Sequence, residues 1–118
     1  MASNDDTSWH IRAEIALLAT LMAGQPITYE GLATAAEIPA PHRIHKLTLW
    51  LEASMAEDVA ARRPLRAAIV ISRRYDRPAK GFFDMAISLG LIDADTPQET
   101  QWQWYRTQRD HACNTYCG

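Results

Sequence analysis

Apolar residues recur at helical spacing near the start of this chain, at intervals of four, three and four positions: Ile11, Ile15, Leu18 and Met22. This periodicity predicts an α-helix over about 8–23, because residues three and four positions apart share one face of a helix. Ser8 is a suitable N-cap residue, and Gly24 followed by Pro26 is typical of a helix end.

A second, short helix is predicted after Thr28, whose hydroxyl can cap the first turn. The buried face of this helix consists of Leu32 and either Ala35 or Ala36. The residue before a proline is disfavoured in helical backbone, so the helix ends before Pro39.

A third and longer helix begins at about Pro41, which fits the first turn because its missing N–H needs no partner there. A regular apolar stripe follows: Ile44, Leu47, Leu51 and Met55. The opposite face carries His42, His45, Lys46, Leu49 and Ala53. Together the short helix, the turn and this helix have the organisation of a helix-turn-helix.

The pattern changes at 67–71, where the apolar run AAIVI predicts a buried strand. A basic loop with turn residues follows. The next segment, FFDMAISLG, predicts a short, largely buried helix that ends at Gly90. The last helix is predicted over 97–113, with Thr96 and Glu99 as the two partners of a capping box.

These elements predict a mainly α-helical protein with a small β element. A strand and a basic loop directly after a helix-turn-helix are typical of a wing, so we expect one winged helix-turn-helix-like domain over 8–95. Residues 1–7 are expected to form a flexible N-terminus, and 96–118 a C-terminal helical extension that packs on the domain. A length of 118 residues suits a single domain with its own core.

The distribution of charge is more informative than the net charge of −2. Residues 43–80 contain nine Lys or Arg and four Asp or Glu, whereas the rest of the chain contains three basic and ten acidic residues. One surface can therefore attract a polyanion while the remainder stays acidic. A solvated basic face without a ligand would have the same composition.

Two basic segments within this stretch are candidates for contacts with duplex DNA. The front of the third helix would face base edges in the major groove, and the loop after the strand would bind phosphates as a wing. Thr28 and the first N–H groups of the short helix would hold a further phosphate. The candidate nucleic-acid-binding residues are Thr28, His42, Arg43, His45, Lys46, Arg73, Arg74, Arg77 and Lys80.

A protein-binding role without nucleic acid stays open, because tryptophan is enriched at the centres of protein interfaces. Leu49 and Trp50 are unusual on a DNA-facing surface. Either they pack under the last helix, or they belong to the contact surface of a homodimer or of another protein partner. The candidate interface residues are Leu49, Trp50, Trp102 and Trp104.

An enzyme is not expected. Cys113 and Cys117 have no partner pair with the spacing of a zinc site, and His111 adds only a third ligand where a closed site needs four. His42 and His45 share a helix face without a third ligand. No glycine-rich phosphate loop is present, so we predict no catalytic residue, metal, cofactor or small-molecule substrate.

Nothing in the sequence predicts a membrane-bound or exported protein. The apolar run near the N-terminus is interrupted at 24–26 and is too short to span a bilayer, and the first residues are acidic rather than basic. Two cysteines close together near one end are typical of reduced thiols. We therefore expect a cytoplasmic protein.

The segment ITYEGLATAAEIPAPHRIHKLTLWL, with the apolar strand and basic turn after it, resembles the DNA-binding part of the alkylguanine-DNA alkyltransferases and alkyltransferase-like proteins. The resemblance covers about 26–81 and implies a winged helix that binds DNA. Where those families have a Pro-Cys-His-Arg motif, this chain has Pro64, Leu65, Arg66 and Ala67. Without the nucleophilic cysteine, alkyl transfer is excluded.

A second resemblance spans more of the chain. The segment PLRAAIVISRRYDRPAKGFFDMAISLGL is similar to a small group of bacterial proteins with no established activity, in which a Gly-Phe-Phe motif precedes a helix ending in Leu-Gly. The matching residues are Gly81, Phe82, Phe83, Leu89, Gly90, Trp102 and Gln108. This resemblance supports the fold and leaves the biological role open, whether regulatory or associated with phage or restriction systems.

Overall fold

Five α-helices and one two-stranded sheet are formed by residues 5–74 and 76–117, the part of the chain that the computed structural model describes, with side chains from residue 8 onward. In chain order the elements are α1 (Asp5–Ala23), β1 (Ile27–Thr28), α2 (Tyr29–Ala35), α3 (Arg43–Ala60), the 3₁₀-helix η2 (Arg66–Ile69), β2 (Val70–Ile71), α4 (Lys80–Ser88) and α5 (Gln98–Tyr116). The predicted fold class, mainly α-helical with a small β element, is confirmed.

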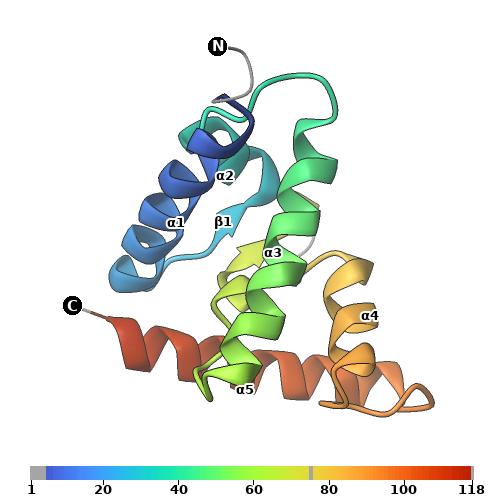
Figure 1. Ribbon diagram of the computed structural model, residues 1–118. Helices are drawn as coiled ribbons and strands as arrows, with labels where there is room; N and C mark the ends of the chain where they lie inside the picture. The colour runs from blue at the N-terminus through green and yellow to red at the C-terminus, as the bar shows by residue number, and fades with distance from the viewer. Residues whose placement is uncertain (1–4, 75, 118) are drawn as a thin grey trace.

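The 3₁₀-helix η2 lies at the centre of the molecule. Figure 1 shows α1, α2 and α3 grouped together, with α5 crossing beneath them and α4 beside α3. The helices α1, α3 and α5 all pack against η2, whose four residues are buried. Tyr105 of α5 donates a hydrogen bond from its hydroxyl to the Ala68 carbonyl oxygen at 2.7 Å. Burial raises the pKa of Tyr105 to about 12, so this phenol stays protonated.

The predicted strand over 67–71 is wrong in its first part. Residues 66–69 form a turn of 3₁₀-helix, and only 70–71 are extended. The cause is a side chain rather than the apolar pattern: the buried Asp58 carboxylate accepts a hydrogen bond from the Arg66 backbone N–H at 3.0 Å. This bond holds the start of the apolar run in a turn.

The sheet is a short parallel pair, in which Ile27 lies beside Val70 and Thr28 beside Ile71. It joins the segment between α1 and α2 to the segment after η2. No further strand follows β2 in the described residues. The chain therefore passes from β2 into α4 through a loop, without the second strand that would make the expected wing a hairpin.

The segment from Thr28 to Ala60 follows the prediction in part: both helices are present, but α3 begins at Arg43, so Pro41 lies before the helix and not in its first turn. The Thr28 hydroxyl oxygen accepts a hydrogen bond from the Gly31 N–H at 3.0 Å and caps α2, as predicted. The connection over 36–42 is longer than the turn of about three or four residues that is usual in this motif. On α3, three of the four side chains in the predicted stripe are buried: Leu47, Leu51 and Met55.

The residues whose spacing predicts α1 are not the residues that α1 buries. Its core-facing side chains are Trp9, Ala13, Leu17 and Leu21. The predicted stripe lies on the opposite face and is exposed: Ile11, Ile15, Leu18 and Met22. The helix is apolar on two faces, so periodicity identifies it without showing which face is covered. Ser8 lies inside α1, and its predicted role as the N-cap is therefore wrong.

The start of α5 also differs from the prediction. The helix begins at Gln98, and Pro97 occupies the N-cap position without a side-chain hydrogen bond. Thr96 and Glu99 do not form a capping box, because the extended backbone at Pro97 moves Thr96 out of the N-cap position. Instead, the Gln101 side-chain amide donates to the Thr96 carbonyl oxygen at 3.1 Å.

The expected boundaries of the domain concern the two ends of the chain. Of the N-terminal segment 1–7, residues 1–4 lie outside the described residues, whereas 5–7 belong to α1. At the other end, α5 packs against η2 and α1. Among the described residues, no helix is both long enough and apolar enough to cross a membrane.

Candidate nucleic-acid interface

Residues 72–74 and 76–79 connect β2 to α4; together with Lys80, the first residue of α4, we call them the basic loop, and they carry four of the predicted nucleic-acid-binding residues. The Ser72 N–H donates a hydrogen bond to the Arg77 carbonyl oxygen at 2.8 Å, which closes the loop. The Ala79 N–H donates to the hydroxyl oxygen of Tyr29, the first residue of α2, at 2.8 Å. Burial raises the pKa of Tyr29, so the phenol stays neutral. One end of the loop is thus fixed to α2.

A second set of contacts fixes the basic loop to α5. Arg109 Nη1 donates to Asp76 Oδ1 at 2.9 Å, and this hydrogen bond holds the pKa of Asp76 below its ordinary value. The Arg77 guanidinium carbon lies 3.6 Å from the centre of the Trp102 ring, in cation–π contact. The loop therefore lies along α5 and does not project from the molecule as a free wing.

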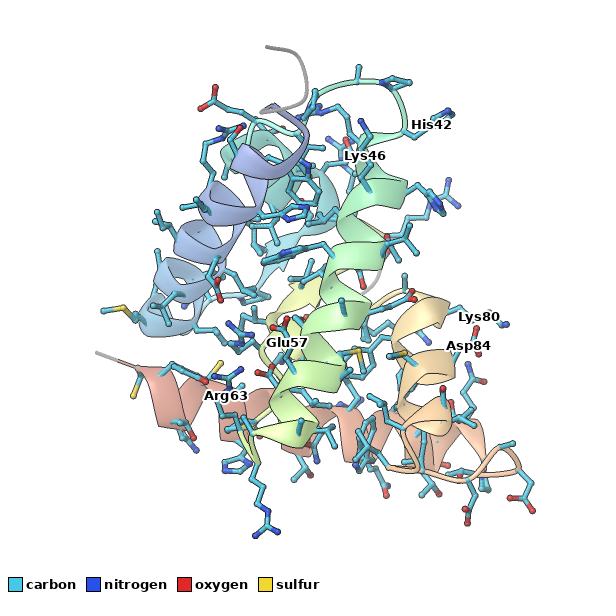
Figure 2. All side chains as sticks on the ribbon, in the orientation of Figure 1. His42, Lys46, Glu57, Arg63, Lys80 and Asp84 are labelled. Atoms are coloured by element: carbon cyan, nitrogen blue, oxygen red, sulfur yellow. The ribbon has the colours of Figure 1, made fainter. Side chains whose placement is uncertain are left out.

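Three basic side chains of the loop face solvent: Arg73, Arg74 and Lys80. Arg73 Nη1 lies 3.4 Å from Glu30 Oε1. Lys80 Nζ lies 3.1 Å from Asp84 Oδ2, and Figure 2 shows this pair on the outer side of α4. Ion pairs between exposed groups contribute at most about 1 kcal/mol, so their partners exchange readily for other anions. These cations therefore remain accessible to a phosphate.

A groove of about 820 Å³ lies beside the basic loop, between α4 and the first turns of α5. Asp84 contributes a carboxylate to its wall, next to cationic, aromatic and amide groups: Arg77, Lys80, Phe83, Gln98, Gln101 and Trp102. An aromatic ring beside a guanidinium and side-chain amides offers both stacking and hydrogen bonds to a nucleotide. The groove thus offers contacts for a base or a sugar, in addition to the phosphate contacts of the basic loop.

The front of α3 does not present its cations as the sequence suggests. Arg43 Nε donates to the Ile38 carbonyl oxygen at 2.8 Å, and Lys46 Nζ donates to the Pro39 carbonyl oxygen at 2.8 Å. The connection after α2 has carbonyl groups that need donors, and positive charge is favoured at the C-terminal end of a helix. Arg43 and Lys46 therefore stabilise the turn, and their side chains are already engaged.

The other predicted nucleic-acid-binding residues near the front of α3 differ in their exposure to solvent. His42 and His45 are exposed. In the view of Figure 2, His42 at the start of α3 and Lys80 at the start of α4 lie along the same edge of the molecule. Thr28 is half-buried, and its hydroxyl oxygen is used as the cap of α2. The two histidines are thus the accessible part of the predicted base-reading surface.

A carboxylate stands where α4 meets α3. A Cβ added to Gly81 in the first turn of α4 would lie 2.7 Å from Glu52 Oε2. The glycine leaves room for the Glu52 carboxylate beside the N-terminal end of α4, where the helix dipole favours negative charge. The Glu52 carboxylate therefore occupies the N-terminal end of α4. Phosphate contacts in this region would be made by side chains and not by the backbone N–H groups of the helix.

Two arginines of the cation-rich segment 43–80 belong to an ion cluster around Asp58, whose side chain is fully buried. Its carboxylate accepts hydrogen bonds from Arg63 Nε and Arg66 Nε, each at 3.0 Å. Arg66 Nη1 also donates to Glu14 Oε1 of α1 at 2.7 Å. Burial lowers the pKa of Arg66, but the hydrogen bonds to Glu14 and Asp58 outweigh it and raise the pKa overall. The charge of Arg66 is therefore compensated by Asp58 and Glu14 and is not presented on the outer surface.

Of the four candidate interface residues, only Leu49 is exposed, at 53%. Trp50 packs edge-on against Trp9 of α1, with ring centres 6.1 Å apart. Trp102 lies under the basic loop, and Trp104 packs on the aromatic part of the core; both are half-buried. The three tryptophans thus have intramolecular partners.

The sequence did not single out the residues that hold the basic loop in place. Arg109 lies 33 positions after Asp76, and no local pattern connects them. Trp102 was assigned to a protein interface, although its ring is a platform for Arg77. Gln101 carries no recognisable signal in the sequence. All of these contacts require α5 to fold back along the loop.

The two cysteines are free thiols near the end of α5. Burial raises the pKa of Cys113, so its thiol is protonated near neutral pH. Within residues 8–74 and 76–117, no three His, Cys, Asp or Glu side chains are grouped so that they could hold a metal ion.

Comparisons of the chain with protein-family models, curated proteins and solved structures found no match. The resemblances to the alkyltransferase families and to the Gly-Phe-Phe group therefore stay predictions. A function for this chain has to come from the geometry of the basic loop and of the surfaces around it.

Proposed function

We propose that this protein binds nucleic acid without catalysing a reaction, and that the basic loop is its phosphate-binding element. One observation carries the proposal: Arg73, Arg74 and Lys80 are exposed on a loop that is fixed to α2 at one point and to α5 at another. Charges that are already positioned lose less conformational freedom on binding a polyanion.

The exposed cations have two different roles in this proposal. Arg74 binds a phosphate directly. Arg73 and Lys80 exchange Glu30 and Asp84 for phosphate oxygens, and the exchange costs little because both pairs are exposed to water. The electrostatic contribution of such contacts is independent of base sequence.

Duplex DNA is the ligand that we favour. The loop cations would bind the phosphate backbone, while the exposed His42 and His45 at the front of α3 would supply contacts to base edges. Arg77, stacked on Trp102, would contact a sugar or a base at the rim of the groove. A cytoplasmic location belongs to the same proposal, since both cysteines are free thiols.

A matched pair of variants tests the proposal. Arg74→Gln and Arg62→Gln each remove one positive charge from an exposed arginine, but Arg62 lies beyond the far end of α3. We expect Arg74→Gln to weaken binding of a random-sequence duplex about three- to tenfold and to reduce the slope of log K against log salt by about 0.9. Fluorescence anisotropy at two or more salt concentrations measures both quantities, and Arg62→Gln should match wild type.

Equal binding by the two variants would exclude the basic loop as the phosphate site. The absence of duplex binding even at low salt would exclude the function itself. Polyglutamate in the same assay tests the alternative of an acidic protein partner, because it presents negative charge without phosphates. Tighter binding of polyglutamate than of the duplex would favour that alternative.

A further inference from the structure

The helix α1 is apolar on two opposite faces, and residues 8–74 and 76–117 cover only one of them. The four outward side chains, which we call the α1 patch, are exposed by 67% at Ile11, 65% at Ile15, 41% at Leu18 and 50% at Met22. Single exposed apolar residues are common on protein surfaces, but four on one helix face form a continuous patch. A helix that is apolar all round is typically buried on both sides.

The α1 patch is open to a partner. Figure 1 shows α1 along one edge of the molecule, with its outer side turned away from α3 and α4. The four side chains expose roughly 400–500 Å² of apolar area, similar to the largest patches found on monomeric proteins. Two such patches, with the residues around them, approach the area of about 1,200 Å² at which specific interfaces begin.

The charged side chains beside the patch are already engaged. Glu14 accepts a hydrogen bond from Arg66 Nη1 at 2.7 Å. Arg12 Nε donates to the Ala36 carbonyl oxygen at 2.6 Å. Neither brings a free charge to the outer face, and no lysine lies on α1. A membrane surface or a charged partner would find little to bind, whereas an equally apolar helix would fit.

The spacing of the patch points to a second copy of the same helix. Intervals of four, three and four positions are those of the a and d positions of a coiled coil, which pack against an identical helix. The order of the intervals is also the same in both directions along the chain. A second copy turned end to end presents the same spacing, so the patch meets the requirement of a two-fold symmetric dimer that both subunits use the same surface.

We propose that the protein forms a homodimer in which the α1 patches of two copies pack against each other. The proposal does not depend on nucleic-acid binding and concerns a different face of the molecule. Since the patch is short, the dimer is weak, with a dissociation constant of about 1–100 µM for an interface at the low end of the size range.

Sedimentation equilibrium from a few µM to a few hundred µM tests the dimer. Wild type should change from the 13.3 kDa monomer to twice that mass over this range. Ile15→Glu should raise the dissociation constant at least tenfold, because it places two charges in an apolar contact. Ile44→Glu is the control, since Ile44 is exposed at 40% but lies on α3, and it should behave as wild type.

A cross-linking experiment keeps the proposal testable if a glutamate disturbs α1. In a chain with Cys113→Ser and Cys117→Ser, Ile15→Cys should form a disulfide-linked dimer on mild oxidation, because residue 15 lies near the middle of the patch. Ile44→Cys in the same background should stay monomeric. Wild type that stays monomeric at the highest concentration, or equal cross-linking of the two cysteine variants, would overturn the proposal.

Discussion

Arg66 and Arg73 stand seven positions apart in one basic stretch, yet they use their charges in opposite ways. Arg66 is buried between Asp58 and Glu14, and bonds to the Asp58 carboxylate at 3.0 Å. The Arg73 side chain is 78% exposed and lies 3.4 Å from Glu30. Losing Asp58 removes the fully buried carboxylate beside Arg66 and leaves it the exposed carboxylates of Glu14 and Glu57, whereas water takes the place of a lost partner in the second pair. Burial, and not charge, decides what each arginine does.

The largest expected effect comes from breaking the buried pair. Asp58→Asn keeps the shape of the side chain and removes its charge, so Arg66 stays buried with the exposed carboxylates of Glu14 and Glu57 as its remaining counter-charges. We expect the free energy of unfolding to fall by about 3–5 kcal/mol. Urea denaturation measures the loss. Glu30→Gln, the same kind of change in the exposed pair, should cost less than about 1 kcal/mol. Similar losses in both variants would contradict the comparison.

An intermediate effect is expected from a buried hydrogen bond without charge. Tyr105→Phe removes only the hydroxyl that donates to the Ala68 carbonyl oxygen, and leaves the ring among its aromatic neighbours. The expected loss is about 1–2 kcal/mol, because a buried carbonyl loses its donor. Thermal or urea unfolding measures it, with Tyr116→Phe at a half-buried position as the control. A loss no larger than in the control would show that this bond does not hold α5 to η2.

The smallest expected effect concerns the exposed pair and appears in binding, not in stability. Glu30→Gln releases Arg73 and removes a negative charge beside the basic loop. Affinity for a duplex should therefore rise about two- to fivefold, in line with the strength of an exposed ion pair. Glu37→Gln, an equal change of charge at the other end of α2, should leave affinity nearly unchanged. Weaker binding by Glu30→Gln would mean that Arg73 does not meet the ligand.

The features of the fold that depend on residues close together in the chain were predictable. Thr28 caps α2 because its hydroxyl needs only the Gly31 N–H, three positions ahead. Gly90 ends α4 with a φ of 77°, a conformation in which glycine has no Cβ to clash. The caps expected at Ser8 and Thr96 did not form, because a cap also depends on where the preceding chain turns. Suitable residue types were therefore necessary but not sufficient.

The candidate site was predictable only in outline. The sequence indicates a loop rich in cations, and that loop exists. It does not indicate that Arg43 and Lys46 fold back onto carbonyl oxygens, because those acceptors are exposed only by the path of the connection after α2. Nor does it connect Asp76 with Arg109, which meet only after α5 has docked.

By itself the sequence determined the main helices and the position of the basic loop along the chain. These features depend on side chains that lie within a turn or two of one another. Only the tertiary structure decided which face of α1 is covered, and which arginine is buried with Asp58 and which stays in water. Those outcomes depend on contacts between segments that lie far apart in the chain, and the free energy of burial is assigned only when the segments meet.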